Sequence, residues 1–315
     1  MRKCVATCIG LAAALAIIAP ADAQAPGDAA ALAAKASALY RAGKYAEALP
    51  LAQQVLSILE RRFGPDHPDI VPHLTNAGLL YQRLGRYREA EPFYRRTLAI
   101  REKSQGSDPA LVSQAISNLA GLYRVMGRLS EAEPLFKRAL VLNEKIGGPE
   151  HPDVANTLHQ LARIYWVQNR VDEVTPLFQR VLAIREKAYG PDHPAVAQTL
   201  NDMAGFYRDQ GQHEEVEPLF KRVLEMTEKA VGPEHAAVAA ALNNLSVLYQ
   251  EMGRHTEAEP LATRALAIRE KTLGPDHPHV AVSIHNLAEL YRALGRKAEA
   301  AELTKREQAI RAKQR

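Results

Sequence analysis

One spacing constrains this sequence more than any other feature: turn signals recur every 42 residues. The glycines of the first series, most of them followed by Pro and then by Asp-His or Glu-His, are Gly64, Gly106, Gly148, Gly190, Gly232 and Gly274. A second series with the same spacing marks a different turn: Gly43, Gly85, Gly127, Asn169, Gly211, Gly253 and Gly295. Two interleaved series at one period predict two helices in each repeat. The 315-residue chain is therefore expected to fold as an all-α array of about seven helix-turn-helix repeats.

The segments between these turns carry the apolar pattern of helices. In one of them Leu119, Leu122, Tyr123 and Met126 recur at three- and four-residue spacing. The first helices of the repeats are expected near residues 29–42, 70–84, 112–126, 154–168, 196–210, 238–252 and 280–294. The second helices are expected near residues 45–62, 87–104, 129–146, 171–188, 213–230, 255–272 and 297–313. Single helices of this length are marginal in water, so each pair must bury its apolar face against its neighbours.

The repeats that follow from these helices lie at about 29–66, 67–108, 109–150, 151–192, 193–234, 235–276 and 277–315. Every second helix except the last carries a proline near its start: Pro50, Pro92, Pro134, Pro176, Pro218 and Pro260. We expect each proline within the first turn or so, where its missing N–H has no helical partner anyway. In the last repeat Glu302 takes this place, and Thr304 and Glu307 replace residues that are apolar elsewhere. This change predicts a polar outer face on a capping helix that ends the array.

The first 23 residues have the pattern of a cleavable secretory signal. Arg2 and Lys3 precede an uncharged run over residues 5–19, and Ala21-Asp22-Ala23 offers a small-x-small cleavage site. We expect cleavage after Ala23, a linker over residues 24–28, and a periplasmic or secreted protein that is not inserted in a membrane after signal removal. The alternative is a membrane anchor, for which the run is short because a span needs about 20 apolar residues.

The sequence gives little support for catalysis or metal binding. Both cysteines, Cys4 and Cys8, lie in the signal, so a mature chain would have no thiol. The chain has no phosphate-binding loop, Gly-x-Ser-x-Gly elbow or His-Glu-x-x-His motif. One histidine recurs in most repeat loops: His67, His151, His193, His235 and His277. Because packed helices stand about 10 Å apart, neighbouring copies are too far apart to share a metal ion, and we expect a structural role. No cofactor and no enzyme activity are expected.

Charge argues against a nucleic-acid partner. The formal net charge is only +4, and Lys and Arg alternate with Glu along the predicted helices instead of forming a basic stripe.

The repeats share one motif, which in one copy reads Leu119-Ala120-x-x-Tyr123-x-x-x-Gly127-Arg128-x-x-x-Ala132-x-x-x-Phe136-x-x-Ala139. It recurs around Tyr81, Tyr165, Tyr207, Tyr249 and Tyr291. With this motif the chain resembles tetratricopeptide repeat proteins, in the 42-residue form found in kinesin light chains and many bacterial arrays. The resemblance covers residues 29–313 and implies an α-solenoid wound as a right-handed superhelix. Its departures are modest: Asn169 replaces a turn glycine, and Val174 and Val216 replace the turn alanine.

Polar residues surround the repeat tyrosine on the first helices, where a buried face would require apolar ones. We call them the polar ladder. Five residues before the tyrosine stand Asn76, Asn118, Gln160, Asp202, Asn244 and Asn286; six before it stand Thr75, Ser117, His159, Asn201, Asn243 and His285; directly after it stand Gln82, Arg124, Trp166, Arg208, Gln250 and Arg292. An amide side chain can both donate to and accept from a peptide backbone, so a row of amides could hold an extended segment of any sequence.

The resemblance implies this peptide-gripping role for Asn76, Asn118, Asn244 and Asn286, and we place Asn201 and Asn243 beside them as candidates. The alternative is that these amides are solvated or bonded to an adjacent helix. Arg124, Arg163 and Arg208 are expected on adjacent repeats of the same face, and guanidinium forks match carboxylates. They favour an acidic segment or a C-terminal carboxylate as ligand; scattered surface charge paired with Glu is the alternative.

Trp166 is the only tryptophan and stands on the polar ladder, which makes it a candidate stacking anchor. Packing against the neighbouring helix is its alternative role. The sequence thus predicts a non-catalytic module that binds an extended peptide or protein segment in the concave groove of the solenoid. The alternative function is a structural scaffold of an envelope assembly that acts through its convex face or its ends.

Overall fold

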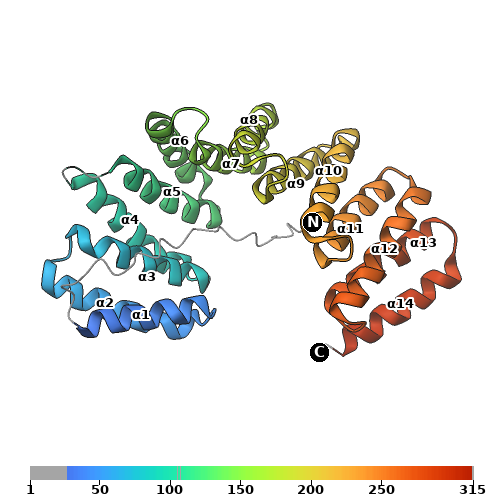
Figure 1. Ribbon diagram of the computed structural model, residues 1–315, viewed down its shortest axis with the longest axis horizontal. Helices are drawn as coiled ribbons and strands as arrows, with labels where there is room; N and C mark the ends of the chain where they lie inside the picture. Colours follow the sequence, from blue (N-terminus) through green and yellow to red (C-terminus); the bar gives the residue numbers. More distant parts are fainter. Residues whose placement is uncertain (1–26, 105, 107, 314–315) are drawn as a thin grey trace. The chain divides into compact units, whose positions relative to one another are not determined.

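The computed structural model describes residues 27–104, 106 and 108–313, so the predicted signal (1–23) and most of the predicted linker lie outside the described residues. Over these residues the chain forms fourteen α-helices and one 3-10 helix, η1 (Pro68–Ile70), and no strand (Figure 1). The first helices of the repeats are α1 (Gly27–Arg41), α3 (Val71–Arg83), α5 (Pro109–Val125), α7 (Pro152–Val167), α9 (Pro194–Asp209), α11 (Ala236–Glu251) and α13 (Pro278–Ala293). The second helices are α2 (Tyr45–Phe63), α4 (Tyr87–Lys103), α6 (Leu129–Gly147), α8 (Val171–Tyr189), α10 (His213–Val231), α12 (His255–Leu273) and α14 (Lys297–Ala312). The predicted all-α repeat architecture is confirmed.

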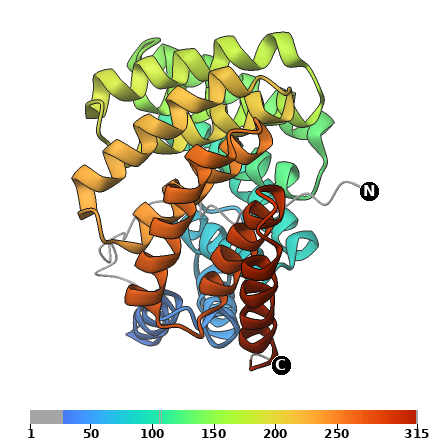
Figure 2. The ribbon, with the colours of Figure 1, turned by 90° about the vertical axis from the view of Figure 1, so that its right-hand side faces the viewer.

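Contacts divide the chain into an N-terminal unit, residues 1–138, and a C-terminal unit, residues 139–315. Within each unit every helix packs on the next one in sequence: α1 to α5 in the first unit, and α7 to α14 in the second. Figures 1 and 2 both show α13 and α14 side by side as the last helical hairpin. Since each hairpin contacts its neighbours in sequence, stability within a unit is shared from repeat to repeat.

The core of each unit is made by the repeat motif. Leu119, Ala120 and Tyr123 are buried on α5, and Leu161 and Ala162 are buried at the same place on α7. The second helices bury the later residues of the same motif, such as Phe178 and Val181 on α8. In the C-terminal unit one of these clusters runs from α9 to α14. The small side chains of Ala120 and Ala162 allow the helices to approach closely.

The turns between helices depend on two features: residues with positive φ, and histidines that cap the next helix. Turn glycines adopt positive φ, as at Gly127 (74°), and Asn169 is the one non-glycine residue with positive φ (60°) in the described part of the chain. Asparagine tolerates this left-handed conformation, so the substitution is compatible with the turn. The loop histidines are helix N-caps: Nδ1 of His193 accepts a hydrogen bond from the Ala195 N–H at 3.1 Å, and His67, His151, His235 and His277 do the same two residues on. Asp108 caps α5 in the loop that lacks the histidine.

The second-helix prolines lie deeper than the sequence suggested. Pro50 is the sixth residue of α2 and Pro92 is the sixth residue of α4, and the other four occupy the same place. A first-turn position was therefore the wrong expectation, because an N–H at this depth would bond the carbonyl four residues before it. The prolines are solvent-exposed, where water can reach that carbonyl oxygen.

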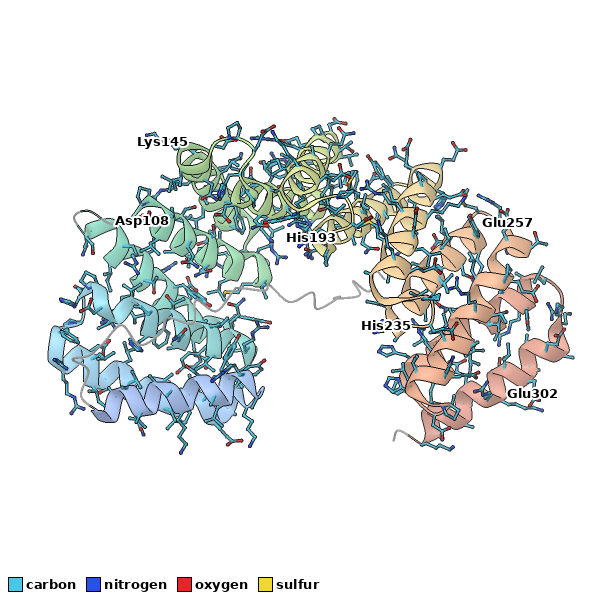
Figure 3. The ribbon with its side chains drawn as sticks, viewed as in Figure 1. Asp108, Lys145, His193, His235, Glu257 and Glu302 are labelled. Carbon is cyan, nitrogen blue, oxygen red and sulfur yellow. The ribbon has the colours of Figure 1, made fainter. Side chains whose placement is uncertain are left out.

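The last helix also departs from expectation. Glu302 is exposed, with a side chain that is 80% accessible (Figure 3). Glu307, which we expected on a polar outer face, is instead buried, at 8% exposure. Its carboxylate accepts a hydrogen bond from Arg311 Nε at 2.8 Å and lies 3.2 Å from Nδ1 of His285. These partners compensate for the burial of the charge, which a sequence pattern does not reveal.

Candidate functional site

The polar ladder of the N-terminal unit presents two of the predicted asparagines. Asn76 on α3 is exposed, and Asn118 on α5 is half-buried. Thr75, beside Asn76, donates its hydroxyl to the carbonyl oxygen of Val71 at 3.0 Å, so it serves its own helix. Arg124 is half-buried at the end of α5. Of these ladder residues in the N-terminal unit, Asn76 is exposed, while Asn118 and Arg124 are both half-buried.

In the C-terminal unit the ladder begins with a buried network between α7, α8 and α9. Nε2 of His159 lies 2.6 Å from Oδ2 of Asp202, and the His159 side chain is 3% exposed. On the other side of the ring, Nη2 of Arg185 lies 3.2 Å from Nδ1. A guanidinium can only donate, so Nδ1 must accept and Nε2 must carry the proton that it donates to Asp202. His159 is therefore neutral in the fold, with its tautomer fixed from both sides.

Burial is the main reason that the pKa of His159 is lowered from its ordinary value. The hydrogen bond to Asp202 acts in the opposite direction, and the charges of Arg185 and Arg163 add to the lowering. Loss of solvent disfavours the imidazolium, which explains the direction. The group thus serves the structure as an uncharged bridge between two repeats.

Arg185 belongs to a link between a second helix and the first helix that follows, which recurs within the C-terminal unit. Its Nη1 donates to the Ala195 carbonyl at 3.0 Å and to the Thr199 hydroxyl at 2.8 Å. Arg269 makes the same pair of contacts with the His279 carbonyl and Ser283, and Asn143 makes it with the Asp153 carbonyl and Thr157. The sequence pattern did not lead us to predict this role. The sequence does carry a signal for it: Asn143, Arg185 and Arg269 are polar, stand at multiples of 42 residues from one another, and interrupt otherwise apolar helix faces.

Several predicted peptide-binding amides are bonded within the array. Nδ2 of Asn286 on α13 donates to Oδ1 of Asn243 on α11 at 2.8 Å, and Nδ2 of Asn201 donates to the Ala197 carbonyl of its own helix at 3.0 Å. Asn244, one residue after Asn243, is exposed. The structure thus places Asn244 toward solvent, joins Asn243 to Asn286 between α11 and α13, and bonds Asn201 to its own helix.

Trp166 packs against the next repeat. Its ring meets Phe206 edge-on at a centroid distance of 6.0 Å, and a Cβ atom added at Gly205 would lie 3.0 Å from its Cη2. Nε1 donates to Oδ2 of Asp209 at 3.1 Å. Gly205 therefore makes room for the indole, and this tryptophan is held between α7 and α9 while part of it stays accessible.

Two of the predicted arginines lie on the same pair of helices. Arg163 on α7 is half-buried near His159, and Arg208 on α9 is exposed. The carboxylates of Asp202 and Asp209 lie on this surface too, each already bonded to a ladder residue. The surface therefore carries both charges, with the more accessible cation at Arg208.

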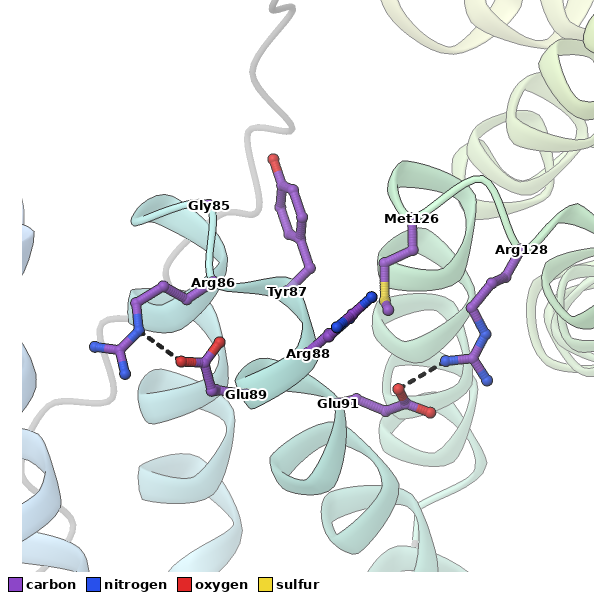
Figure 4. Close-up of a pocket in the computed structure, with 8 residues that line it drawn as sticks. All are labelled: Gly85, Arg86, Tyr87, Arg88, Glu89, Glu91, Met126 and Arg128. Atoms are coloured by element: carbon purple, nitrogen blue, oxygen red, sulfur yellow. Dashed lines mark hydrogen bonds and ion pairs between the residues drawn. The ribbon is translucent and has the colours of Figure 1, made fainter.

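A second recurring arrangement lies at the repeat turns, and we call each copy a tyrosine junction. At the Tyr123 junction the Arg128 guanidinium lies 4.2 Å from the tyrosine ring centroid and donates through two nitrogens to Glu131, both at 2.6 Å. It also donates to Glu91 of the preceding repeat at 2.7 Å, and the Tyr123 hydroxyl donates to the same glutamate at 3.1 Å. Figure 4 shows Arg128 and Glu91 beside a surface pocket lined by Gly85 and its neighbours.

The Tyr249 junction repeats this arrangement in the C-terminal unit. Arg254 lies 4.2 Å from the Tyr249 ring centroid and bonds Glu257 and Glu217, and Lys221 also pairs with Glu217. Hydrogen bonds from Arg254 and Lys221 lower the pKa of Glu217 to about 2. Arg296 stacks on Tyr291 at 3.9 Å and bonds Glu299 and Glu259 in the same way. The Tyr123, Tyr249 and Tyr291 junctions each tie one repeat to the next through an ion pair and a stacked ring.

The loop histidines and acidic residues do not converge on a metal site. No group of three or more His, Cys, Asp or Glu side chains is placed to hold a metal ion among the residues that the structure describes. Within the same residues, no helix combines the length and the apolar character that crossing a bilayer requires.

Comparison with known proteins identifies the family. The family model described as Tetratricopeptide repeat matches residues 28–103, 111–187, 170–229, 195–271 and 237–313. The chain is 32% identical to nearly identical TPR-like repeats from a Podosopora anserina protein assigned to the kinesin light chains, with a TM-score of 0.59 over 66% of this chain and 98% of that one. A search of curated proteins finds no match.

More distant solved structures share the fold. The apo form of RapI is 13% identical, with a TM-score of 0.62 over 91% of this chain and 98% of that one. A signal transduction ATPase with a tetratricopeptide repeat sensor, PH0952 from Pyrococcus horikoshii, is 18% identical, with a TM-score of 0.71 over 90% of this chain and 42% of that one. Together with the repeat motif and the paired helices, the family model shows that this chain belongs to the tetratricopeptide repeat family, with repeats like those of the kinesin light chains.

Proposed function

We propose that this protein is a non-catalytic interaction module that binds an extended peptide or protein segment on the polar ladder. The observation that carries the proposal is how the ladder of the C-terminal unit is fixed. Three contacts join a ladder residue to the residue 43 positions on: His159 to Asp202, Trp166 to Asp209, and Asn243 to Asn286. These contacts hold the first helices in one register and leave other polar side chains exposed between them.

The exposed members supply the recognition chemistry. Asn244 can donate to and accept from a backbone amide at once, and Arg208 can form a fork with a carboxylate. A ladder that is already rigid loses little conformational entropy on binding, which favours affinity. In the N-terminal unit Asn76 and Asn118 offer the same amide chemistry. A side-chain carboxylate or a C-terminal carboxylate beside the bound backbone is the acidic feature we propose for the partner.

A similar fold is known with a bound partner. A Rap protein was solved in complex with Competence and Sporulation Factor; it is 19% identical to this chain, with a TM-score of 0.52 over 91% of this chain and 77% of that one. It supports the proposal by analogy of fold, and the residues that would bind are argued from this chain alone.

The test is a cross-linked pull-down with the mature chain. The binding variant is Arg208→Ala with Asn244→Ala, and the matched control is Glu225→Ala with Thr263→Ala, two exposed residues on second helices of the same unit. All proteins are first compared for helical content. We expect the wild type and the control to recover a partner that the binding variant loses. Recovery of the same partners by all three proteins would reject the ladder as the binding surface and favour the scaffold function, in which the convex face or the ends act.

Export is part of the proposal. Residues 1–23, which the structure does not describe, carry the signal pattern, so the mature protein is proposed to begin at Gln24 and to act in the periplasm or outside the cell. Cell fractionation with N-terminal sequencing tests this directly. An uncleaved N-terminus in the cytoplasmic fraction would contradict it, whatever the outcome of the pull-down.

A further inference from the structure

One tyrosine junction of the C-terminal unit has lost its arginine. At the Tyr207 junction, Gln212 stands at the place of Arg128 and Arg254, and Thr175 stands at the place of Glu91 and Glu217. Gln179 occupies the position of Arg95 and Lys221, which pair with that glutamate in the other junctions. Only Glu215, the counterpart of Glu131 and Glu257, is kept. The junction therefore keeps the tyrosine and one carboxylate but has neutral residues in place of both cations.

The structure shows an open surface at this place. A pocket there is lined by Thr175, Gln179, Tyr207, Gly211, Gln212, His213, Glu214, Glu215 and Met252. Tyr207 is half-buried, while Tyr123 and Tyr249 are buried under their arginines. In the described chain, no cation stacks on the Tyr207 ring, and Glu215, which is exposed, forms no ion pair.

We propose that this pocket binds the guanidinium group of an arginine side chain from a partner peptide or protein. The chain itself displays the occupied form of such a site. At the Tyr123 junction the guanidinium lies over the ring while two of its nitrogens bond both oxygens of Glu131. Tyr207 and Glu215 offer the same ring and the same carboxylate, with no internal arginine between them.

The charge of the pocket favours a cation, and its shape favours arginine over lysine. Glu214 and Glu215 are both acidic, and no Lys or Arg is among the lining residues. The amide oxygens of Gln179 and Gln212 can accept further N–H groups. A planar guanidinium can stack on a tyrosine ring and form a fork with a carboxylate at the same time, which an ammonium group cannot.

This site is separate from the polar ladder. It lies at the turn between α9 and α10 and uses neither Asn244 nor Arg208, so its failure would not touch the proposed ladder function. The most direct variant is Gln212→Arg, because it fills the pocket with the chain's own guanidinium, as at the neighbouring junctions. Its matched control is Thr256→Arg, which adds the same charge to the same surface one repeat further on, at an exposed position.

The experiment selects peptides from a random heptapeptide library on the wild-type mature chain at low salt. It then measures their affinities by fluorescence anisotropy. We expect wild-type binders enriched in arginine, and replacement of that arginine by citrulline, which is uncharged, or by lysine should weaken binding by about fivefold or more. Gln212→Arg should bind them as weakly as the citrulline peptide binds wild type. Thr256→Arg, and Arg208→Ala with Asn244→Ala, should bind like wild type.

Three results would overturn the assignment. If the selected peptides were not enriched in arginine, the pocket would not be a guanidinium site. If the lysine peptides bound with equal affinity, the pocket would be a general cation site. If wild type and Gln212→Arg bound the peptides equally well, the arginine of the peptide would bind at a site other than this pocket. Analytical sedimentation of the proteins without peptide tests whether the chain binds itself through this pocket. If the wild type self-associates and Gln212→Arg does not, the pocket binds a second copy of this chain, and the proposal of an external partner is rejected.

Discussion

Several helices of this protein have a histidine as their N-cap residue, a position that aspartate or serine commonly occupies. Nδ1 of His193 accepts from the Ala195 N–H at 3.1 Å, which satisfies one of the free N–H groups at the start of α9. We expect His193→Ala to lower the free energy of unfolding by about 1 kcal/mol, and His193→Asp to lose much less, because Asp108 caps α5 in the same way. Urea unfolding measures both variants. Equal losses in the two would show that the ring acts by packing and not as a cap.

His159 gives a second prediction at this scale, in its pH dependence. Since burial lowers its pKa in the folded protein, the unfolded chain takes up this proton first as the pH falls below about 6.5. The unfolded state then binds more protons than the folded state, so stability must fall as the pH falls through that value. We expect His159→Gln to show a shallower loss of stability between about pH 6.5 and pH 5 than the wild type.

The matched control for this pH dependence is His279→Gln, which changes an exposed histidine on α13. It should keep the wild-type slope in urea titrations repeated across the pH range. If His159→Gln and His279→Gln gave the same slope, the neutral histidine inferred between Arg185 and Asp202 would be wrong.

At the scale of the element, a tyrosine junction that keeps its arginine and glutamates, such as the Tyr249 junction, fixes one hairpin to the next. Glu217 accepts hydrogen bonds from Arg254, Lys221 and the Tyr249 hydroxyl, and its pKa is lowered to about 2. Its contribution is present above the ordinary glutamate pKa of about 4.5 and is lost as the pH falls from there toward about 2. We expect Glu217→Gln to lower stability at pH 7 by on the order of 1 kcal/mol and to flatten the acid limb of the stability profile. Glu225→Gln, exposed on the same helix, is the control and should change neither.

The helices themselves could be predicted from the sequence, because period and turn chemistry are local properties. The predicted range 213–230, for example, became α10 (His213–Val231). For the candidate site, the sequence predicted which helix face carries the polar residues, but not which of those side chains are exposed and which are bonded within the array. Whether Asn286 meets solvent or Asn243 depends on the register of α13 against α11, and whether Trp166 is open depends on Gly205 of the next repeat. Glu307 shows the same limit, since its burial is made possible by His285 and Arg311. The His285–Glu307 and Asn243–Asn286 contacts join residues 22 and 43 positions apart, and neither partner alone marks the contact in the sequence.

At the scale of the whole molecule, an array of this kind is as stable as its repeats and the contacts between neighbours allow. Within the C-terminal unit the contacts differ. The Tyr249 and Tyr291 junctions each carry an arginine between two glutamates, and the Tyr207 junction carries none. The Tyr207 junction therefore lacks the ion pair that its two counterparts form, although Arg222 and Lys229 of α10 still pair with Glu186 and Asp192.

Restoring the missing pair should therefore strengthen the unit at one defined place. We expect Gln212→Arg with Thr175→Glu to raise the free energy of unfolding by about 1 kcal/mol, since the new guanidinium would gain the Tyr207 ring, Glu215 and the new carboxylate. Thr175→Glu alone should stabilise nothing, because it adds a third acid beside Glu214 and Glu215 with no cation between them. The pair should thus be non-additive, as residues in contact are. Hydrogen exchange would locate the effect: amides of α9 and α10 should slow more than those of α13 and α14. An additive pair, or slowing spread evenly over the unit, would mean that the Tyr207 junction does not limit its stability.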